Sequence, residues 1–305
     1  MKKTILFIVI ISMSCIFASC TSDSLDYDSD DPDVILSNIL AGYRTNGMTS
    51  WWEVVAVYNA GENPLDYKGF ADVLDSLANA RDTNTAMASY VIVANIALVI
   101  GADEMYFEKY GEYKSRLKDL LENPTDDYTL NDYIFGYFAL KTSGMEFDEM
   151  RFYNYFADSQ KSDGGFALMG NSGDADMTAF AIQALKLLYR NDDPNIDPDS
   201  DTWPLVNAIK FLEDNISDDG TFSSFGSENA NSTAVALSAL DGEHRQRAFD
   251  ALALFKVKGE AGYSFLQGGR SDAKATAQVA IALGDFKNNM SVWEKLYLDS
   301  VNYIN

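Results

Sequence analysis

The chain has 305 residues, and its 46 acidic side chains against 23 lysines and arginines give a formal net charge of −23 at pH 7. So negative a surface repels phosphate backbones and anionic lipid headgroups, which excludes nucleic acid as a partner. The only cysteines, Cys15 and Cys20, lie near the N-terminus, so the rest of the chain has no disulfide and no thiolate for a metal. Its stability must come from a hydrophobic core.

Residues 1–19 have the pattern of an export signal. Lys2 and Lys3 precede an apolar run that is too short to span a membrane as a mature helix. The run ends in Phe-Ala-Ser-Cys, which resembles the lipobox of bacterial lipoproteins, in which the cysteine is acylated and becomes the new N-terminus. This resemblance implies lipid attachment at Cys20, export, and anchoring to a bacterial membrane facing outside the cytoplasm. An ordinary secretory signal cleaved near Ala18 is the alternative.

Residues 20–33 are predicted to be a solvated, disordered tether. Six aspartates and almost no apolar side chains occur between Thr21 and Asp33, a composition that cannot bury enough surface to fold. The remainder, 34–305, is long enough to form one large domain.

Within that domain a helical motif recurs six times. In three clear copies an aromatic residue precedes a threonine by 11 or 12 residues, and the threonine precedes an Ala-Leu pair by six. The aromatic residues of these copies are Phe166, Phe222 and Phe265. With three degenerate copies, the six anchor residues are Ser50, Val91, Tyr133, Thr178, Thr233 and Thr276, at intervals of 41, 42, 45, 55 and 43 residues. Such intervals fit helical hairpins, which bury their apolar faces by stacking on one another.

Amphipathic segments alternate with the anchored helices, which are more uniformly apolar. The extreme case, 90–100, is too short for a membrane span and is predicted to be a core helix. The amphipathic segments lie near 66–80, 110–122, 148–160, 203–217, 244–257 and 292–304. This alternation predicts an all-α fold with two concentric layers, an α6/α6 toroid. The last amphipathic segment would close the ring by pairing with the helix at 50–60, and Trp51, Trp52 and Trp293 at the two ends favour such closure.

These repeats resemble those of the terpenoid cyclase and protein prenyltransferase toroid superfamily. Residues 155–166 are similar to its QW-type repeat, because Phe156, Gln160 and Phe166 have the characteristic spacing, with phenylalanine in place of tryptophan. The resemblance covers nearly all of 40–305 and implies the same ring of helices.

The catalytic branches of that superfamily need residues that this chain mostly lacks. Prenyltransferases hold zinc with Asp, Cys and His, but the domain has a single histidine, His244, so no metal site is expected. Class II terpene cyclases protonate their substrate with the middle aspartate of Asp-x-Asp-Asp-Thr-Ala. Residues 174–179 resemble that motif and imply Asp176 as general acid beside Asp174, while Met177 replaces the adjoining aspartate. A strong acid depends on such neighbours, so a cyclase-like isomerase or lyase is the less favoured alternative.

The arrangement also resembles the helical domain of the intrinsic factor and transcobalamin group and its bacterial surface homologues, which are non-catalytic. That resemblance implies a ligand or a surface partner held at the mouth of the ring, with a corrinoid among the candidate ligands. The vertebrate carriers close over their ligand with a small β-domain. The last predicted helix reaches residue 305, so we expect no such lid within this sequence.

Polar residues just before the anchors have two interpretations. Asp and Asn at the start of a helix cap its free N–H groups. Repeat symmetry also gathers them at one end of the inner barrel, where six helix N-termini add partial positive charge that suits a polar ligand. The candidate ligand-binding residues are Asp174, Asp176, Asn131, Asn229, Asn231, Asp272, Trp51 and Tyr133. A third hypothesis is an adhesion or scaffold domain whose ring is packed solid.

Overall fold

The computed structural model describes residues 26–80, 83–125, 128–189, 204–224 and 226–304. The predicted signal peptide and the first part of the predicted tether, including Cys20, lie outside the described residues. In the part that is described, none of the helices combines the length and the hydropathy that a membrane crossing requires.

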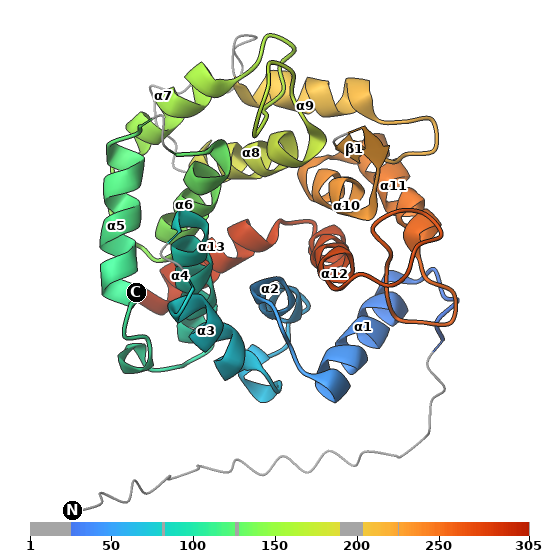
Figure 1. Cartoon of the computed structure of the whole chain (residues 1–305), viewed down its shortest axis with the longest axis horizontal. Coiled ribbons are helices and arrows are strands. Elements are labelled where there is room, and N and C mark those ends of the chain that lie inside the picture. Colours follow the sequence, from blue (N-terminus) through green and yellow to red (C-terminus); the bar gives the residue numbers. More distant parts are fainter. Residues whose placement is uncertain (1–25, 81–82, 126–127, 190–203, 225, 305) are drawn as a thin grey trace, which may run out of the picture.

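The inner layer of the fold is a closed ring of six helices (Figure 1). These helices are α2 (Trp51–Asn59), α4 (Asn84–Val99), α6 (Leu130–Thr142), α8 (Ala175–Leu188), α10 (Ala230–Ala239) and α12 (Ala273–Asn288). Each contacts the next, and α12 contacts α2. Most of their residues are small or apolar and fully buried, because each helix packs on both neighbours, on the outer layer and on the ring centre.

Six amphipathic helices form the outer layer. They are α1 (Pro32–Asn46), α3 (Phe70–Ala78), α5 (Tyr110–Glu122), α7 (Glu149–Ser159), α9 (Pro204–Asn215) and α11 (Gly242–Ala251). Each buries one stripe, as α5 does with Tyr113, Leu117 and Leu121 against α4 and α6. The connections contain η1 (Pro64–Asp66), η2 (Glu104–Tyr106), η4 (Leu252–Phe255) and a hairpin of β1 (Ser223–Ser224) with β2 (Ser227–Glu228). The predicted all-α, α6/α6 toroid is therefore confirmed.

The prediction that the last amphipathic segment is the sixth outer helix is wrong. That place belongs to α1, which packs on α12, whereas α13 (Val292–Ile304) crosses the base of the ring and contacts α2, α4, α6, α8 and α12. The reason is the connection: Asn289 adopts a left-handed conformation (φ 47°) and α13 begins three residues later. So short a turn keeps α13 beneath the end of the inner barrel.

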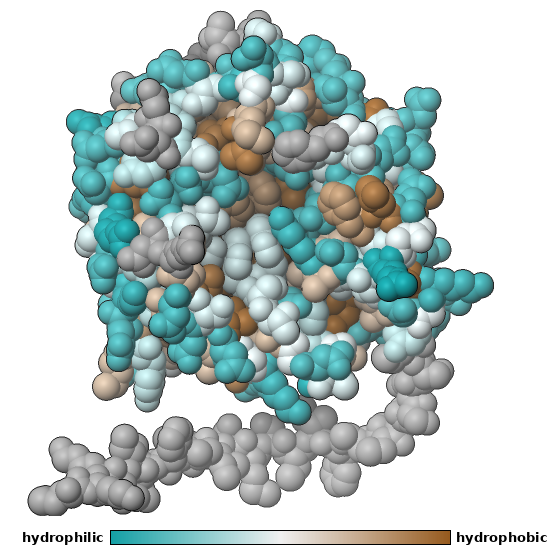
Figure 2. All heavy atoms as spheres, viewed as in Figure 1, coloured by the Kyte–Doolittle hydropathy of each residue, from teal (hydrophilic) through white to brown (hydrophobic). Residues whose placement is uncertain are grey.

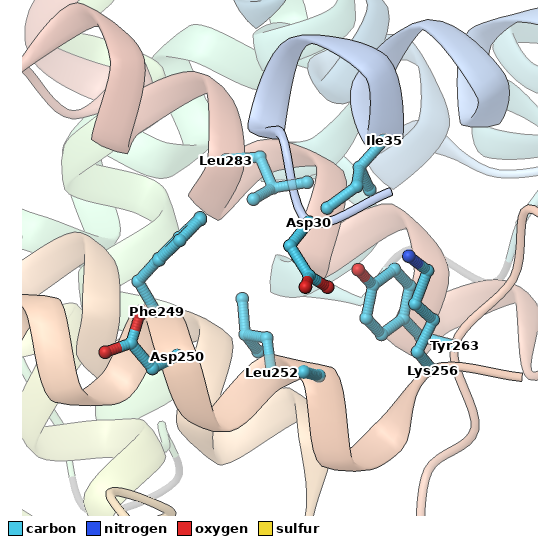
Figure 3. Close-up of a pocket in the computed structure, with 9 residues that line it drawn as sticks. Asp30, Ile35, Phe249, Asp250, Leu252, Lys256, Tyr263 and Leu283 are labelled. Atoms are coloured by element: carbon cyan, nitrogen blue, oxygen red, sulfur yellow. The ribbon is translucent and has the colours of Figure 1, made fainter. Parts of the chain in front are cut away.

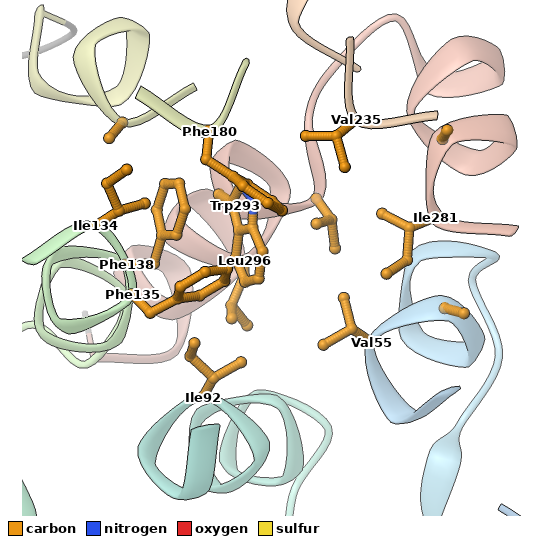
Figure 4. Close-up of a cluster of buried hydrophobic side chains, with 14 of the residues drawn as sticks. Val55, Ile92, Ile134, Phe135, Phe138, Phe180, Val235, Ile281, Trp293 and Leu296 are labelled. Carbon is orange, nitrogen blue, oxygen red and sulfur yellow. The ribbon is translucent and has the colours of Figure 1, made fainter. Parts of the chain in front are cut away.

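Aromatic and aliphatic side chains fill the ring centre (Figure 4). The inner helices contribute Val55, Ile92, Phe135, Phe138, Phe180, Val235 and Ile281, and α13 contributes Trp293 and Leu296. The Trp293 ring stacks on Phe138 with centroids 4.4 Å apart and is only 2% exposed. A space of about 20 Å³ remains beside them, enough for roughly one water molecule.

The recurring threonines fasten the aromatic loops to the inner helices. Their hydroxyl oxygens accept hydrogen bonds from backbone N–H groups in the pairs Thr178 with Phe166 (2.8 Å), Thr233 with Phe222 (3.0 Å) and Thr276 with Tyr263 (2.9 Å). The third aromatic position is therefore Tyr263, which is buried, and not the predicted Phe265, which is 43% exposed.

The predicted repeat frame is shifted in the first two copies. The N-cap residues of the inner helices are Ser50, Thr83, Thr129, Asp174, Asn229 and Asp272. The last four anchors lie four residues after their caps, but Ser50 is itself a cap and Val91 lies eight residues after Thr83. Each of these two helices thus enters the ring about one turn away from the predicted position.

Part of the segment predicted as tether lies against the ring. The side-chain amide of Asn38 donates to the Asp26 carbonyl at 2.8 Å, and the Lys256 ammonium donates to the Ser29 carbonyl. The first helix begins at Pro32, whose fixed φ suits the first helical position, after the cap at Asp31.

Candidate functional site at the mouth of the ring

The inner helices all begin at the same end of the ring, which we call the mouth. There the side chains of three candidate residues cap their own helices. Asp174 accepts from the N–H of Met177 at 2.8 Å, Asn229 from that of Ser232 at 2.9 Å, and Asp272 from that of Ala275 at 2.8 Å. The capping interpretation therefore holds for these three residues.

A different set of residues lies two positions after each cap and faces the ring axis. This set, the rim, consists of Trp52, Thr85, Asn131, Asp176, Asn231 and Lys274. Residues four positions further along a helix share its face, and those positions include Phe135, Phe180 and Val235, which point into the ring centre (Figure 4). The rim side chains make no capping bond and are the first polar groups above the apolar centre.

Aromatic rings form the floor of the mouth. Trp51 and Trp52 are half-buried and stack with their centroids 3.9 Å apart. The Phe135 ring lies edge-on to both, at 5.6 and 5.8 Å, and Phe180 lies 6.1 Å from Trp52. Seen along the ring axis, the molecule has hydrophobic and weakly polar residues near its centre and hydrophilic ones around them (Figure 2).

Two carboxylates of the α8 N-terminus occupy different environments. Asp176 is half-buried and accepts a hydrogen bond from the Ser224 hydroxyl at 2.9 Å. Asp174 accepts two hydrogen bonds, because in addition to its capping bond it accepts one from the N–H of Leu168 at 3.2 Å. Burial raises the pKa of Asp174, backbone N–H groups oppose that change, and the negative charge of Asp176 adds to it.

Two buried amide oxygens near the axis have no hydrogen-bond partner in the described part of the chain. They are Oδ1 of Asn231, a rim residue 8% exposed, and Oε1 of Gln278 on the neighbouring helix, 6% exposed. Leaving a buried acceptor unpaired costs about 1–3 kcal/mol, unless water or a ligand donates to it. Gln278 and Trp52 line the same small space, and so does Val235, one helical turn after Asn231, so both unpaired groups lie at the same end of the ring as the aromatic floor.

The structure separates the other candidates. Asn131 is a rim residue, and its amide donates to the Thr85 hydroxyl at 3.3 Å. Tyr133 is instead fully buried between the layers, with its ring 3.8 Å from that of Tyr155 and its hydroxyl accepting from the N–H of Thr125. It is therefore a core residue and not a ligand contact.

Four mouth residues, Trp52, Thr85, Lys274 and Gln278, were not among the predicted candidates. Trp52 and Thr85 were missed because the predicted repeats were misaligned in the first two copies. Gln278 was missed because it lies within a helix that the sequence predicts to be buried. A usable signal for Gln278 was its place four residues after Lys274, on the axis-facing side.

The described residues offer little for acid catalysis or metal binding. Asp176 has a serine and not a second carboxylate as its hydrogen-bond partner, and the space of about 20 Å³ in the ring centre is lined by Phe180, one helical turn further along α8. Within the described ranges, no three His, Cys, Asp or Glu side chains come together as a possible metal site. His244 lies on an outer helix with its Nδ1 3.5 Å from a Glu213 carboxylate oxygen.

Comparison with solved structures supports the ring fold. The chain is similar to haptocorrin in a crystal structure of its complex with Cbi, with a TM-score of 0.53 and 15% sequence identity. The match covers 88% of this chain and 67% of the haptocorrin chain. No protein-family model and no curated protein matches the chain. At this identity the likeness shows a shared α/α toroid fold.

Proposed function

We propose that this chain is a non-catalytic binding protein that holds a small organic ligand at the mouth of its ring. The observation that carries the proposal is the pair of unpartnered buried amide oxygens, on Asn231 and Gln278, next to the half-exposed tryptophan stack. A bound molecule that donates to these acceptors removes their desolvation cost. A ligand with a broad apolar face and N–H or O–H donors at its edge has this chemistry.

A corrinoid is the first ligand to test. Its macrocycle offers a large apolar face for Trp51 and Trp52, and its peripheral amides carry N–H donors for Asn231, Gln278 and Asp176. Haptocorrin, the similar structure, was solved in complex with Cbi, which supports the choice. Because the small space in the ring centre has a volume of only about 20 Å³, the ligand would rest on the mouth and not enter the barrel, and the buried Asn231 and Gln278 side chains would turn toward it.

We also propose that the protein is exported and held at a bacterial membrane by a lipid on Cys20. The apolar run after Lys2 and Lys3 and the small residues before the cysteine support this proposal. Incorporation of a labelled fatty acid into the full chain, and its loss in Cys20→Ser, would test it. Release of an unlabelled, shortened protein from the wild-type gene would favour cleavage near Ala18 instead.

A second candidate function is an adhesion or scaffold domain. The filled ring centre favours it, because a solid ring presents its outer surfaces and encloses no ligand (Figure 4). A cyclase with Asp176 as general acid has weaker support, since a linear isoprenoid needs far more room than the space of about 20 Å³ beside Phe180, one helical turn further along α8.

Native mass spectrometry of the full chain with cobinamide, linear isoprenoids and oligosaccharides tests the binding proposal. We expect a one-to-one adduct with unchanged ligand mass for one class. Asn231→Leu and Gln278→Met should each weaken that adduct about tenfold, because each new side chain has a volume similar to the original one but lacks its acceptor oxygen. Neither substitution should destabilise the free protein, because the oxygen that it removes accepts no hydrogen bond there. Asn79→Ala, on the exposed end of α3, is the matched control.

If no ligand of the panel is retained, the scaffold hypothesis replaces the binding proposal. If an adduct forms but both variants bind as well as the wild type, the ligand lies elsewhere and the mouth is not the site. Conversion of an isoprenoid to an isomer of equal mass, detected by chromatography, would establish the cyclase.

A further inference from the structure

A second cavity lies at the seam of the ring, where the first outer helix, α1, comes next to the last, α11 (Figure 3). It has a volume of about 210 Å³. Its apolar wall is formed by Ile35 of α1, Phe249 of α11, Leu252 of η4 and Leu283 of α12. We call it the seam pocket. The outer layer leaves this gap because α11 ends at Ala251 and continues as the tighter helix η4.

The segment before α1 covers one side of the seam pocket, and two lysines hold this segment and the first turn of α1 in place. The Lys256 ammonium donates to the Ser29 carbonyl, and Lys287 of α12 forms an ion pair with Asp33. Between these two attachments lies Asp30, which lines the pocket. The aspartate is therefore held in place by contacts that do not involve its own carboxylate.

The Asp30 carboxylate points into the seam pocket, toward the side where the Tyr263 hydroxyl also lies (Figure 3). In the described part of the chain this carboxylate takes part in no hydrogen bond or ion pair. Burial, and secondarily the negative charge of Asp30, raises the pKa of Tyr263, so its phenol stays neutral. The pocket lining thus combines an apolar wall, the exposed Asp30 carboxylate without a hydrogen-bond partner, a neutral hydroxyl and the Lys256 ammonium.

The charged residues around the seam pocket favour a ligand with a positive charge. Asp250 also lines the pocket, and its carboxylate is occupied by the Gln246 amide at 2.9 Å, so it adds negative charge without adding a free acceptor. The segment 26–33 carries five aspartates. Lys256 also lines the pocket and keeps its positive charge, because the Ser29 carbonyl to which it donates is neutral, so the lining has two carboxylates against one ammonium. An anionic ligand would be repelled, whereas a cation gains a charge-assisted hydrogen bond to Asp30.

We propose that the seam pocket is a binding site for a small amphiphilic amine, with its hydrocarbon part against Phe249, Leu252 and Leu283 and its ammonium on Asp30. An enclosed apolar cavity of about 150 Å³ admits benzene, so this one has room for a six-carbon chain or a single ring. The site is separate from the mouth and independent of the function proposed there. It assigns a role to the aspartate-rich segment, which closes the pocket and supplies its recognition group.

Titration of the full chain with n-hexylamine, followed by ligand-observed NMR, tests this site. The matched ligands are n-hexanol and n-hexanoate, which keep the chain length and change the charge. We expect hexylamine to bind at least about tenfold more tightly than hexanol, and hexanoate not to bind. Asp30→Asn should remove that advantage, while Asp28→Asn, which changes an aspartate that is also exposed but does not line the pocket, should keep it.

A steric variant gives an independent readout. Ala253 lines the seam pocket and is exposed, so Ala253→Phe fills the cavity from its open side without disturbing the core, and should abolish hexylamine binding. Absence of hexylamine binding to the wild type, equal binding of hexanoate, or unchanged binding by Asp30→Asn would each overturn the proposal. Circular dichroism of all variants establishes that a loss of binding is not a loss of folding.

Discussion

The threonine of the repeat motif is predicted to hold its aromatic loop in place, and Thr178→Val tests this directly. The Thr178 hydroxyl accepts from the Phe166 N–H at 2.8 Å, and both residues are fully buried. Valine keeps the volume and loses the hydroxyl. The Phe166 carbonyl keeps its bond from the Asp174 N–H at 2.8 Å, so only one buried donor is left unpaired. One such donor costs about 1–3 kcal/mol.

Urea unfolding followed by circular dichroism measures that cost. We expect the free energy of unfolding to fall by about 2 kcal/mol, which corresponds to a drop in Tm of about 4–8 °C for a domain of this size. The control is Thr45→Val, because the exposed Thr45 hydroxyl bonds only to the Ala41 carbonyl of its own helix. That change should stay within about 0.5 kcal/mol. A stability of Thr178→Val equal to that of the control would refute the fastening role.

Two further predictions concern a glycine turn and a buried acid. Gly220 has φ +85° and a Cβ there would overlap the Arg247 carbonyl oxygen, so Gly220→Ala should destabilise by about 2–4 kcal/mol in urea unfolding. Gly226→Ala, at φ +80° with open space around it, should cost only about 1 kcal/mol; equal losses would contradict the overlap. Burial raises the pKa of Asp285 to about 7, so the folded state keeps its proton while the unfolded chain loses it near pH 4. The free energy of unfolding should therefore fall from pH 4 to 8 by up to about 4 kcal/mol relative to Asp285→Asn, and a pH-independent difference between the two would disprove this.

Helix periodicity predicted which segments are helical better than where they lie. The stripe of α13 was recognised in the sequence, but its position depends on the left-handed Asn289 and the short turn after it. Those features decide whether a helix continues the outer layer or folds under the barrel. Periodicity carries no information about that choice, because either position buries the same face.

The opposite failure occurred at α1. Its buried residues Ile35, Leu36, Ile39, Leu40 and Tyr43 form a regular amphipathic stripe, and Asp31-Pro32 is a good helix start. The signal was therefore present. It was missed because the aspartates before it suggested one continuous tether, whereas the ring needs a sixth outer helix to cover α12.

The repeats were aligned correctly where the motif is well preserved and were misaligned where it is degenerate. In the last three copies a buried backbone N–H needs the threonine, so the sequence records a contact between two distant segments. In α2 and α4 no such loop is fastened, and only small and apolar residues remain. An apolar helix matches an Ala-Leu spacing in several registers one turn apart, so the first two frames slipped.

The caps and the rim explain why one position of the repeat is suited to recognition. Every inner helix needs a hydrogen-bond acceptor at its cap, and all six caps are small polar residues: Ser50, Thr83, Thr129, Asp174, Asn229 and Asp272. Two residues after each cap that requirement no longer applies, so the side chains of the rim differ widely in chemistry. They are Trp52, Thr85, Asn131, Asp176, Asn231 and Lys274. Replacing any of the five caps other than Ser50 removes a hydrogen bond from the side chain to the helix and costs about 0.5–2 kcal/mol. Replacing a rim residue leaves every cap intact, so the chemistry of the mouth is free to change while the ring stays the same.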